Sequence, residues 1–200
     1  AAATPGAAVD HFTLAKQYHN LGDFEQAVRH YLALLDREPL NAEARNNLGM
    51  LYLDRGLLKE ATEQFDRAVR INPQYTVARG NLGVALLNTG RLAEARAQLR
   101  TALDGDPRNV GILVNLALVQ KAEGHPEQAL ETLVRAIGID PAHAYAHYNL
   151  AVLYDERRDL AKAYEHYTAF LKYAGPEHGS TLSEVERRVN AIEGRLDRKR

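Results

Sequence analysis

The chain has 200 residues, of which 46% are hydrophobic and 26% are charged. These fractions are typical of a soluble folded protein, and no apolar run is long enough to cross a bilayer. The 25 basic residues nearly equal the 26 acidic ones, so we expect neither nucleic-acid binding nor direct membrane insertion. The lack of cysteine excludes disulfides, thiolate nucleophiles and cysteine-ligated metals, and it fits a bacterial cytoplasm and a periplasm equally well.

Proline recurs along the chain at strict intervals of 34 residues, as Pro39, Pro73, Pro107 and Pro141. Such a period indicates a repeat architecture rather than one closed core. We number each repeat so that this proline is position 32. The predicted order is then a linker over 1–7, repeats over 8–41, 42–75, 76–109, 110–143 and 144–177, and a C-terminal segment over 178–200.

Other positions of the repeat agree with this frame. Position 20 is always alanine and position 7 is always leucine, whereas position 15 is glycine in four repeats and Arg158 in the fifth. Glycine tolerates the left-handed backbone that ends many helices, and proline stops a helix because its nitrogen cannot donate a hydrogen bond. Each repeat is therefore predicted to be a helix, a turn and a second helix.

The C-terminal segment is predicted to form one further helix, over about 181–197. Its apolar residues recur at helical spacing, and Ser183 with Glu186 has the spacing of a capping box at the start of such a helix. We expect this helix to cover the last repeat, as the exposed end of a repeat array requires. The basic residues of the tail, which complement the dipole of a helix C-terminus, are Arg195, Arg198, Lys199 and Arg200.

The second repeat carries a pattern that resembles the tetratricopeptide repeat (TPR) family. The matching residues are Leu48, Gly49, Tyr52, Ala61, Phe65, Ala68 and Pro73. The resemblance implies an all-α fold, a right-handed superhelical solenoid of five TPR helix-turn-helix repeats plus a C-terminal capping helix. One departure is position 4, where the tryptophan of the family is replaced by His11, Arg45, Arg79, Leu113 and His147.

In the family, the first helices of the repeats line a concave surface that binds protein segments. Carried over by position, this implies a groove that is largely apolar, and exposed apolar surface usually marks an interaction site. The predicted groove residues are Asn46, Met50, Val77, Val84, Leu87, Val114, Leu118, Tyr145, Tyr148 and Val152.

Position 6 is asparagine in four successive repeats, as Asn47, Asn81, Asn115 and Asn149. An amide both donates and accepts hydrogen bonds, so a regular row of amides can bind an extended peptide backbone. This asparagine ladder is similar to that of the repeat domains of O-GlcNAc transferases. The alternative is that these side chains bond to neighbouring helices and hold the repeats together.

Catalysis and cofactor binding have no candidate site in the sequence. His143 and His147 have the spacing of two metal ligands on one helix, but no third ligand accompanies them, and packing roles are favoured. Phosphate-binding and nucleophile motifs are absent, so no enzyme activity and no cofactor are predicted. The basic cradle with which some family members bind chaperone tails is missing too.

The sequence therefore predicts a non-catalytic scaffold or adaptor that binds a peptide segment or helix of a partner protein in its concave groove. Two alternatives remain open. One is a self-assembling scaffold, a homo-oligomer that organises other proteins. The other is the substrate-recruiting repeat region of a larger glycosyltransferase-like protein, which rests on the asparagine ladder alone.

Overall fold

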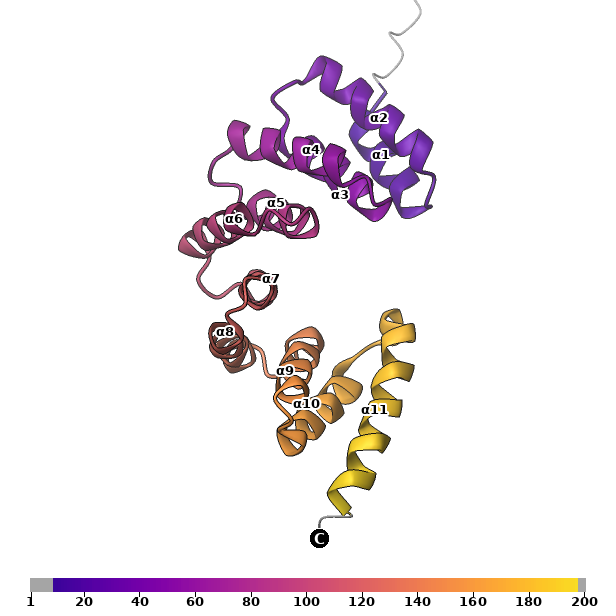
Figure 1. Cartoon of the computed structure of the whole chain (residues 1–200). Coiled ribbons are helices and arrows are strands. Elements are labelled where there is room, and N and C mark those ends of the chain that lie inside the picture. Colours follow the sequence, from indigo (N-terminus) through magenta and orange to yellow (C-terminus); the bar gives the residue numbers. More distant parts are fainter. Residues whose placement is uncertain (1–8, 198–200) are drawn as a thin grey trace, which may run out of the picture. The chain divides into compact units, whose positions relative to one another are not determined.

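The computed structural model describes residues 9–197, and within this range the protein consists of α-helices, one short 3-10 helix and no strand (Figure 1). The predicted linker at 1–7 and the basic residues Arg198, Lys199 and Arg200 lie outside the described residues. Among the described helices, none is both long and apolar enough to cross a membrane.

The chain divides into two compact units, which meet in sequence between Arg91 and Leu92. Unit 1 contains α1 (His11–Asn20), α2 (Phe24–Arg37), α3 (Ala42–Asp54), α4 (Leu58–Ile71) and α5 (Thr76–Asn88). Unit 2 contains α6 (Leu92–Gly105), α7 (Val110–Ala122), α8 (Pro126–Ile139), α9 (Ala144–Glu156), α10 (Leu160–Tyr173), the 3-10 helix η1 (Pro176–His178) and α11 (Gly179–Asp197). Inside each unit, consecutive helices pack as neighbours.

The turn between the two helices of a repeat has the same backbone in all five repeats. Position 15 has a positive φ throughout, from 69° to 80° at the four glycines and 61° at Arg158. Arg158 is the only non-glycine residue with positive φ among those described. The turn therefore imposes the left-handed conformation even where a side chain makes it costly.

The first helices of several repeats begin at a side chain that caps them. Asn41 accepts a hydrogen bond from the Ala44 amide at 2.9 Å, and Asn109 accepts one from Ile112 at 3.1 Å. His143 takes the same position before α9. Such caps satisfy amides that have no partner within the helix.

Small residues let the helices pack closely. Ala27, Ala61, Ala129 and Ala163, all at position 20, have no exposed surface. In repeat 2 a Cβ added at Gly49 would lie 2.7 Å from the Phe65 ring, so α3 and α4 touch at van der Waals distance there. Burying a side chain such as Phe65 stabilises the fold by about 2–3 kcal/mol.

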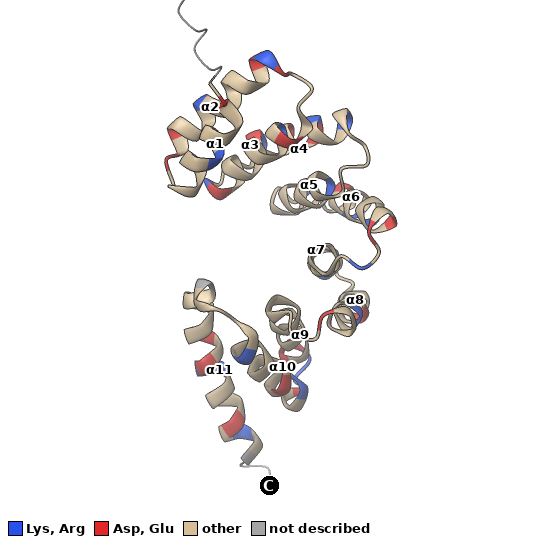
Figure 2. Cartoon of the chain, turned by 180° about the vertical axis from the view of Figure 1, so that it is seen from behind, with Lys and Arg blue, Asp and Glu red and all other residues tan. Residues whose placement is uncertain are grey.

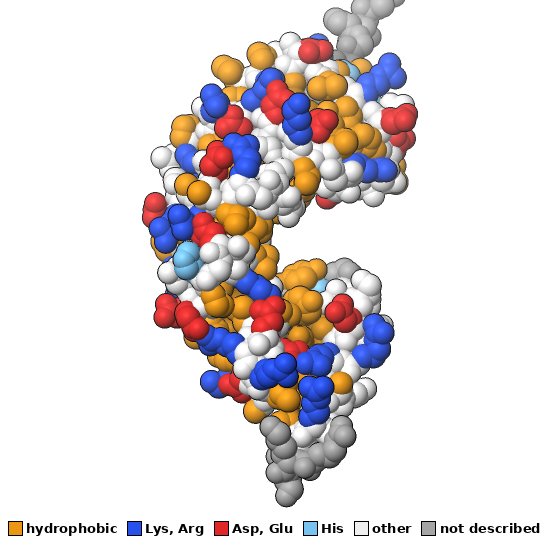
Figure 3. All heavy atoms as spheres, in the orientation of Figure 1, with side chains coloured by type: hydrophobic (Ala, Val, Ile, Leu, Met, Phe, Trp, Pro, Cys, Tyr) orange, Lys and Arg blue, Asp and Glu red, His pale blue; other side chains and the backbone are white. Residues whose placement is uncertain are grey.

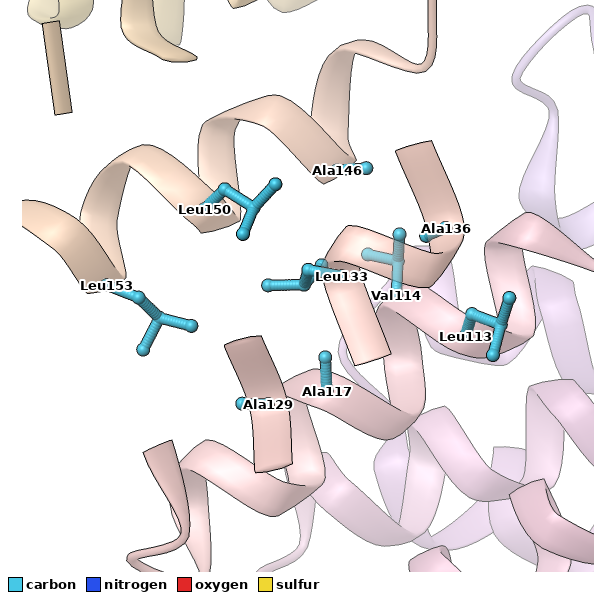
Figure 4. Packing of buried hydrophobic residues seen from close by; sticks show 9 residues of the cluster. All are labelled: Leu113, Val114, Ala117, Ala129, Leu133, Ala136, Ala146, Leu150 and Leu153. Atoms are coloured by element: carbon cyan, nitrogen blue, oxygen red, sulfur yellow. The ribbon is translucent and has the colours of Figure 1, made fainter. Parts of the chain in front are cut away.

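The core of unit 2 is continuous from repeat 4 into repeat 5. Figure 4 shows its residues on α7, α8 and α9, with Leu133 lying between Val114 and Leu150. Leu133 and Leu150 are each no more than 1% exposed. Since a single repeat cannot enclose its own apolar face, repeats 4 and 5 stabilise each other.

Position 4, where the family has tryptophan, holds the buried Leu113 in repeat 4 and a polar side chain in the other four repeats. Arg45 donates to the Pro39 carbonyl at 2.8 Å and to Gln64 at 3.2 Å. His147 lies 3.0 Å from the Pro141 carbonyl and 3.1 Å from Nδ1 of His166. These hydrogen bonds connect the position-4 side chain both to the preceding turn and to the second helix of its own repeat.

The capping-box prediction was wrong. Helix α11 begins at Gly179, so Ser183 lies inside the helix, where its carbonyl accepts a hydrogen bond from Arg187. The 3-10 turn from Pro176 to His178 replaces the predicted cap, and the His178 ring binds the Gly175 carbonyl at 3.1 Å. The predicted covering role is confirmed, because Val185 and Ile192 are buried against α9 and α10.

Replacing Arg158 by glycine should stabilise the protein. The exposed Arg158 adopts a left-handed backbone that costs a non-glycine residue about 1–2 kcal/mol, and glycine would remove this cost. Part of the gain is offset because glycine loses more conformational entropy on folding. We expect a net gain of about 0.5–1 kcal/mol in urea unfolding. The reverse change, Gly124→Ala, should lower stability by a similar amount; a loss of stability in Arg158→Gly would contradict the explanation.

Acidification should destabilise the two terminal repeats through paired histidines. Nδ1 of His11 and His30 lie 2.8 Å apart, and His147 and His166 form the equivalent pair. Burial, and then the charge of the partner histidine, lowers the pKa of His30 and His166 below the ordinary value of 6.5. Because the unfolded chain then binds more protons, stability is fully present above pH 6.5 and is lost as the pH falls below it.

The measurement is the melting temperature of the wild type and of a His30→Gln/His166→Gln double variant between pH 8 and pH 5. Glutamine occupies this position in repeat 2 as Gln64, where it bonds to Arg45, so the variant keeps a polar partner. Its melting temperature should fall less on acidification than that of the wild type. Replacement of the exposed His125 by glutamine serves as the control, and equal slopes in all three proteins would refute the role of the pairs.

Candidate functional site

The asparagine ladder is divided between the two units, and in unit 1 its amides bond to the protein itself. The Asn81 amide donates to Asn46 Oδ1 at 2.9 Å, which links α5 to α3. Asn46, only 4% exposed, in turn donates to Asn47 Oδ1 at 3.3 Å. Here the ladder holds successive repeats together.

Asn47 is also tied to the first repeat, because its side chain hydrogen-bonds to the Tyr31 hydroxyl. Burial raises the pKa of Tyr31 to about 12, which keeps this hydroxyl neutral at any physiological pH. The remaining predicted groove residues of unit 1 are more accessible. Met50, Val84 and Leu87 are half-buried, and Val77 is 55% exposed.

In unit 2 the ladder residues lie at a hollow of about 350 Å³ on the first helices of repeats 4 and 5. We call it the α7–α9 hollow, and its lining residues are Gly111, Val114, Asn115, Leu118, His143, Tyr145 and Asn149. Asn149 donates to the Tyr145 carbonyl at 2.7 Å, one turn earlier on α9. For the side chain of Asn115, by contrast, no hydrogen bond to any other described residue is found.

The hollow lacks full charges. None of its lining residues is acidic or is a lysine or arginine, and α7 carries Lys121 as its single charged residue (Figure 2). Apolar side chains lie at the surface over α7 and the start of α9, whereas charged ones gather over α8 (Figure 3). Tyr145, at the start of α9, is 49% exposed.

These repeats match known sequences over most of the chain. Sequence profiles described as Tetratricopeptide repeat match residues 12–76, 52–109, 86–135 and 120–174. The chain belongs to the tetratricopeptide repeat family. The predicted all-α TPR fold is thereby confirmed, and repeats of this family serve as protein-interaction scaffolds. No curated protein matches the sequence.

Several solved TPR structures share the fold. PilF of Pseudomonas aeruginosa is 21% identical with a TM-score of 0.75, and the match covers 94% of this chain and 89% of that one. The protein TTC0263 of Thermus thermophilus is 22% identical with a TM-score of 0.73, covering 92% and 97%. YrrB, described as a TPR protein with an unusual peptide-binding site, is 23% identical with a TM-score of 0.65, covering 90% and 92%.

Helix α11 takes the place that the first helix of a sixth TPR would occupy. Between repeats, a side chain at position 12 pairs with the first helix of the next repeat, as in Lys121 with Glu156 at 2.6 Å. In repeat 5 the same position is Asp155, which accepts a two-pronged hydrogen bond from Arg188 of α11. The Tyr167 hydroxyl also reaches Asp155, at 3.5 Å, and burial raises the pKa of Tyr167.

In this arrangement two predicted groove residues pack against α11. Tyr148 and Val152 are partly buried in the cluster that contains Val185 and Ile192 of α11. A second hollow of about 420 Å³ remains beside them, but its walls include the Asp155–Arg188 ion pair and α11 itself. Tyr145 also touches the C-terminal segment, with its ring centroid 4.7 Å from that of His178.

Two residues of the α7–α9 hollow were not predicted as site residues, namely Gly111 and His143. Gly111 occupies position 2, which the repeat frame places on the inner surface. Because it has no side chain, it leaves room for the α7–α9 hollow. For His143 the sequence suggests a metal ligand together with His147 or, with more support, a packing role. The two have separate roles, because His143 caps α9 whereas His147 is buried against Pro141 and His166.

The two halves of the ladder should respond differently to mutation. Asn81→Ala leaves the buried Asn46 carbonyl oxygen without its donor, so the free energy of unfolding should fall by about 1–2 kcal/mol. Asn115→Ala breaks no bond within the described protein and should change stability by less than about 0.5 kcal/mol. Urea unfolding of both variants measures this, and equal losses would contradict the division of the ladder.

Proposed function

We propose that the protein is a non-catalytic scaffold or adaptor that binds an extended peptide segment of a partner protein in the α7–α9 hollow. The observation that carries this proposal is an uncharged, mainly apolar hollow with two side-chain amides in its lining, at a place where the TPR frame presents residues to a partner. Val114 and Leu118 supply the apolar part. Asn115 and Asn149 supply the polar part.

The chemistry of the hollow suits a peptide better than a charged ligand. A bound peptide group brings one donor and one acceptor, and both can replace water on the asparagine side chains. The volume of about 350 Å³ is at the lower end of the range for small-molecule pockets, enough for one large apolar side chain with its backbone. Without lysine, arginine or acidic residues in the lining, an ionised side chain would lose its hydration without gaining a partner.

One structural relative supports this proposal, since YrrB is described as having a peptide-binding site. The two alternatives are less well supported. Repeat 1 has the polar Asp10 and Gln17 at positions 3 and 10, where repeat 2 buries Ala44 and Leu51 against the preceding repeat. A polar face disfavours end-to-end stacking of copies, and the involvement of Asn81 in structure weakens the ladder argument for a glycosyltransferase-like role.

Filling the hollow should weaken peptide binding without harming the fold. A Cβ at Gly111 would meet only the Asn109 side chain, at an ordinary 3.5 Å, and valine occupies the equivalent position in repeat 3 as Val77. Peptides selected on the immobilised wild type from a random 12-residue display library should bind Gly111→Val about tenfold more weakly, a difference of about 1.4 kcal/mol.

Gly138→Val is the matched control. Gly138 is an exposed helical glycine of α8 with open space around its Cβ position, and it does not line the hollow. The Gly138→Val variant should bind the selected peptides with the same affinity as the wild type, as measured by calorimetry. Equal affinity of Gly111→Val and Gly138→Val for every selected peptide would place binding elsewhere on the protein.

A further inference from the structure

We propose that His143 is a ligand-contacting residue of the α7–α9 hollow, whose Nε2–H donates a hydrogen bond to a main-chain carbonyl of the bound peptide. This inference rests on the proposed function and deepens it, because it defines the class of ligand. The hollow is expected to select an uncharged amide unit that carries an apolar side chain.

The hydrogen bond at the start of α9 determines which ring nitrogen carries the proton. The Ala146 backbone amide donates to Nδ1 of His143 at 3.2 Å, so Nδ1 must present a lone pair. A neutral imidazole has one N–H and one bare nitrogen. The proton of His143 is therefore on Nε2, on the opposite side of the ring from the helix.

Nε2 of His143 is accessible to a ligand. Within the described residues, no hydrogen bond from it to protein is found, and no buried side-chain nitrogen or oxygen is left without a partner. An unpaired Nε2 in a residue that is only half-buried must then reach the surface, and His143 lines the hollow. It offers a donor there.

Asn149 provides the matching acceptor. Its amide nitrogen donates one of its two hydrogens to the Tyr145 carbonyl, and its Oδ1 is left as an acceptor for a ligand. A peptide unit carries one carbonyl and one N–H, which complement His143 and Asn149, while Asn115 can serve either. A carboxylate has no N–H to donate, and an ester has none in its link, so neither can donate to Oδ1 of Asn149.

The capping role alone does not require histidine. Asn41 and Asn109 cap the equivalent helices of repeats 2 and 4 with shorter hydrogen bonds, of 2.9 and 3.1 Å. What histidine adds is a second nitrogen across the ring, directed away from the helix that it caps. His143→Asn therefore keeps the cap and removes the Nε2–H across the ring. The amide nitrogen of the new asparagine is expected to bond to Asp140, as that of Asn109 bonds to Asp106 at 3.0 Å.

The test uses the full chain and N-acetyl-leucine N-methylamide as the probe. Binding is measured by NMR, from the chemical shifts of the side-chain amides of Asn115 and Asn149 as the probe is added. The wild type should show saturable shifts, and long-range proton–nitrogen correlations should show the Nε2–H form of His143. His143→Asn should keep its melting temperature and bind about fivefold more weakly, the expected loss of one hydrogen bond. N-acetyl-leucine methyl ester, which lacks the second amide N–H, should bind more weakly than the amide to both proteins.

The failures are distinguishable. If the amide probe shifts Asn115 and Asn149 equally in the wild type and in His143→Asn, the role of His143 is refuted while peptide binding in the hollow stands. An Nδ1–H form of His143 would refute the inference as well. If the probe shifts neither asparagine in the wild type, both the inference and the proposed binding site fail. Asn41→His, the converse exchange at a cap outside the hollow, should leave binding unchanged, and a weaker affinity there would show that the effect is not local.

Discussion

The close contact between the two helices of each repeat is the constraint on which the remaining structure depends. Alanine at position 20 and alanine or glycine at position 8 leave no room for larger side chains, as the Gly49–Phe65 contact shows. A pair of helices packed in this way still has an apolar face on its other side, and only the next repeat can cover that face. The buried leucines of α7, α8 and α9 form such a shared core.

A stacked array has two consequences for binding. The first helices repeat the same register, so residues 34 apart in sequence face the same surface, and this brings Asn115 and Asn149 to one hollow. The array must also end, and α11 ends it by occupying the place of a further repeat. In doing so it packs against Tyr148 and Val152, while Tyr145 stays largely exposed at the α7–α9 hollow.

The same residue type at one repeat position serves different purposes. Asn81 is held by Asn46, which lies 35 residues earlier, but the residue 35 before Asn115 is Gly80, which has no side chain that could accept such a hydrogen bond. A polar group that bonds to its neighbours contributes to stability, whereas one that reaches the surface without a partner is available to a ligand. Position in the repeat alone does not distinguish the two.

The sequence by itself determined the repeat length, the helix-turn-helix units and most of the core, because these follow from local rules. Glycine at the turn, proline after the second helix and alanine at the contact are read directly from a 34-residue period, and even Arg158 adopts the expected left-handed backbone. Only the tertiary structure decided where α11 begins, which ladder amides are bonded, and that His143 faces the hollow. These depend on contacts between different repeats and on which side chain is long enough to meet its neighbour, and a period in the sequence carries no information about such distances.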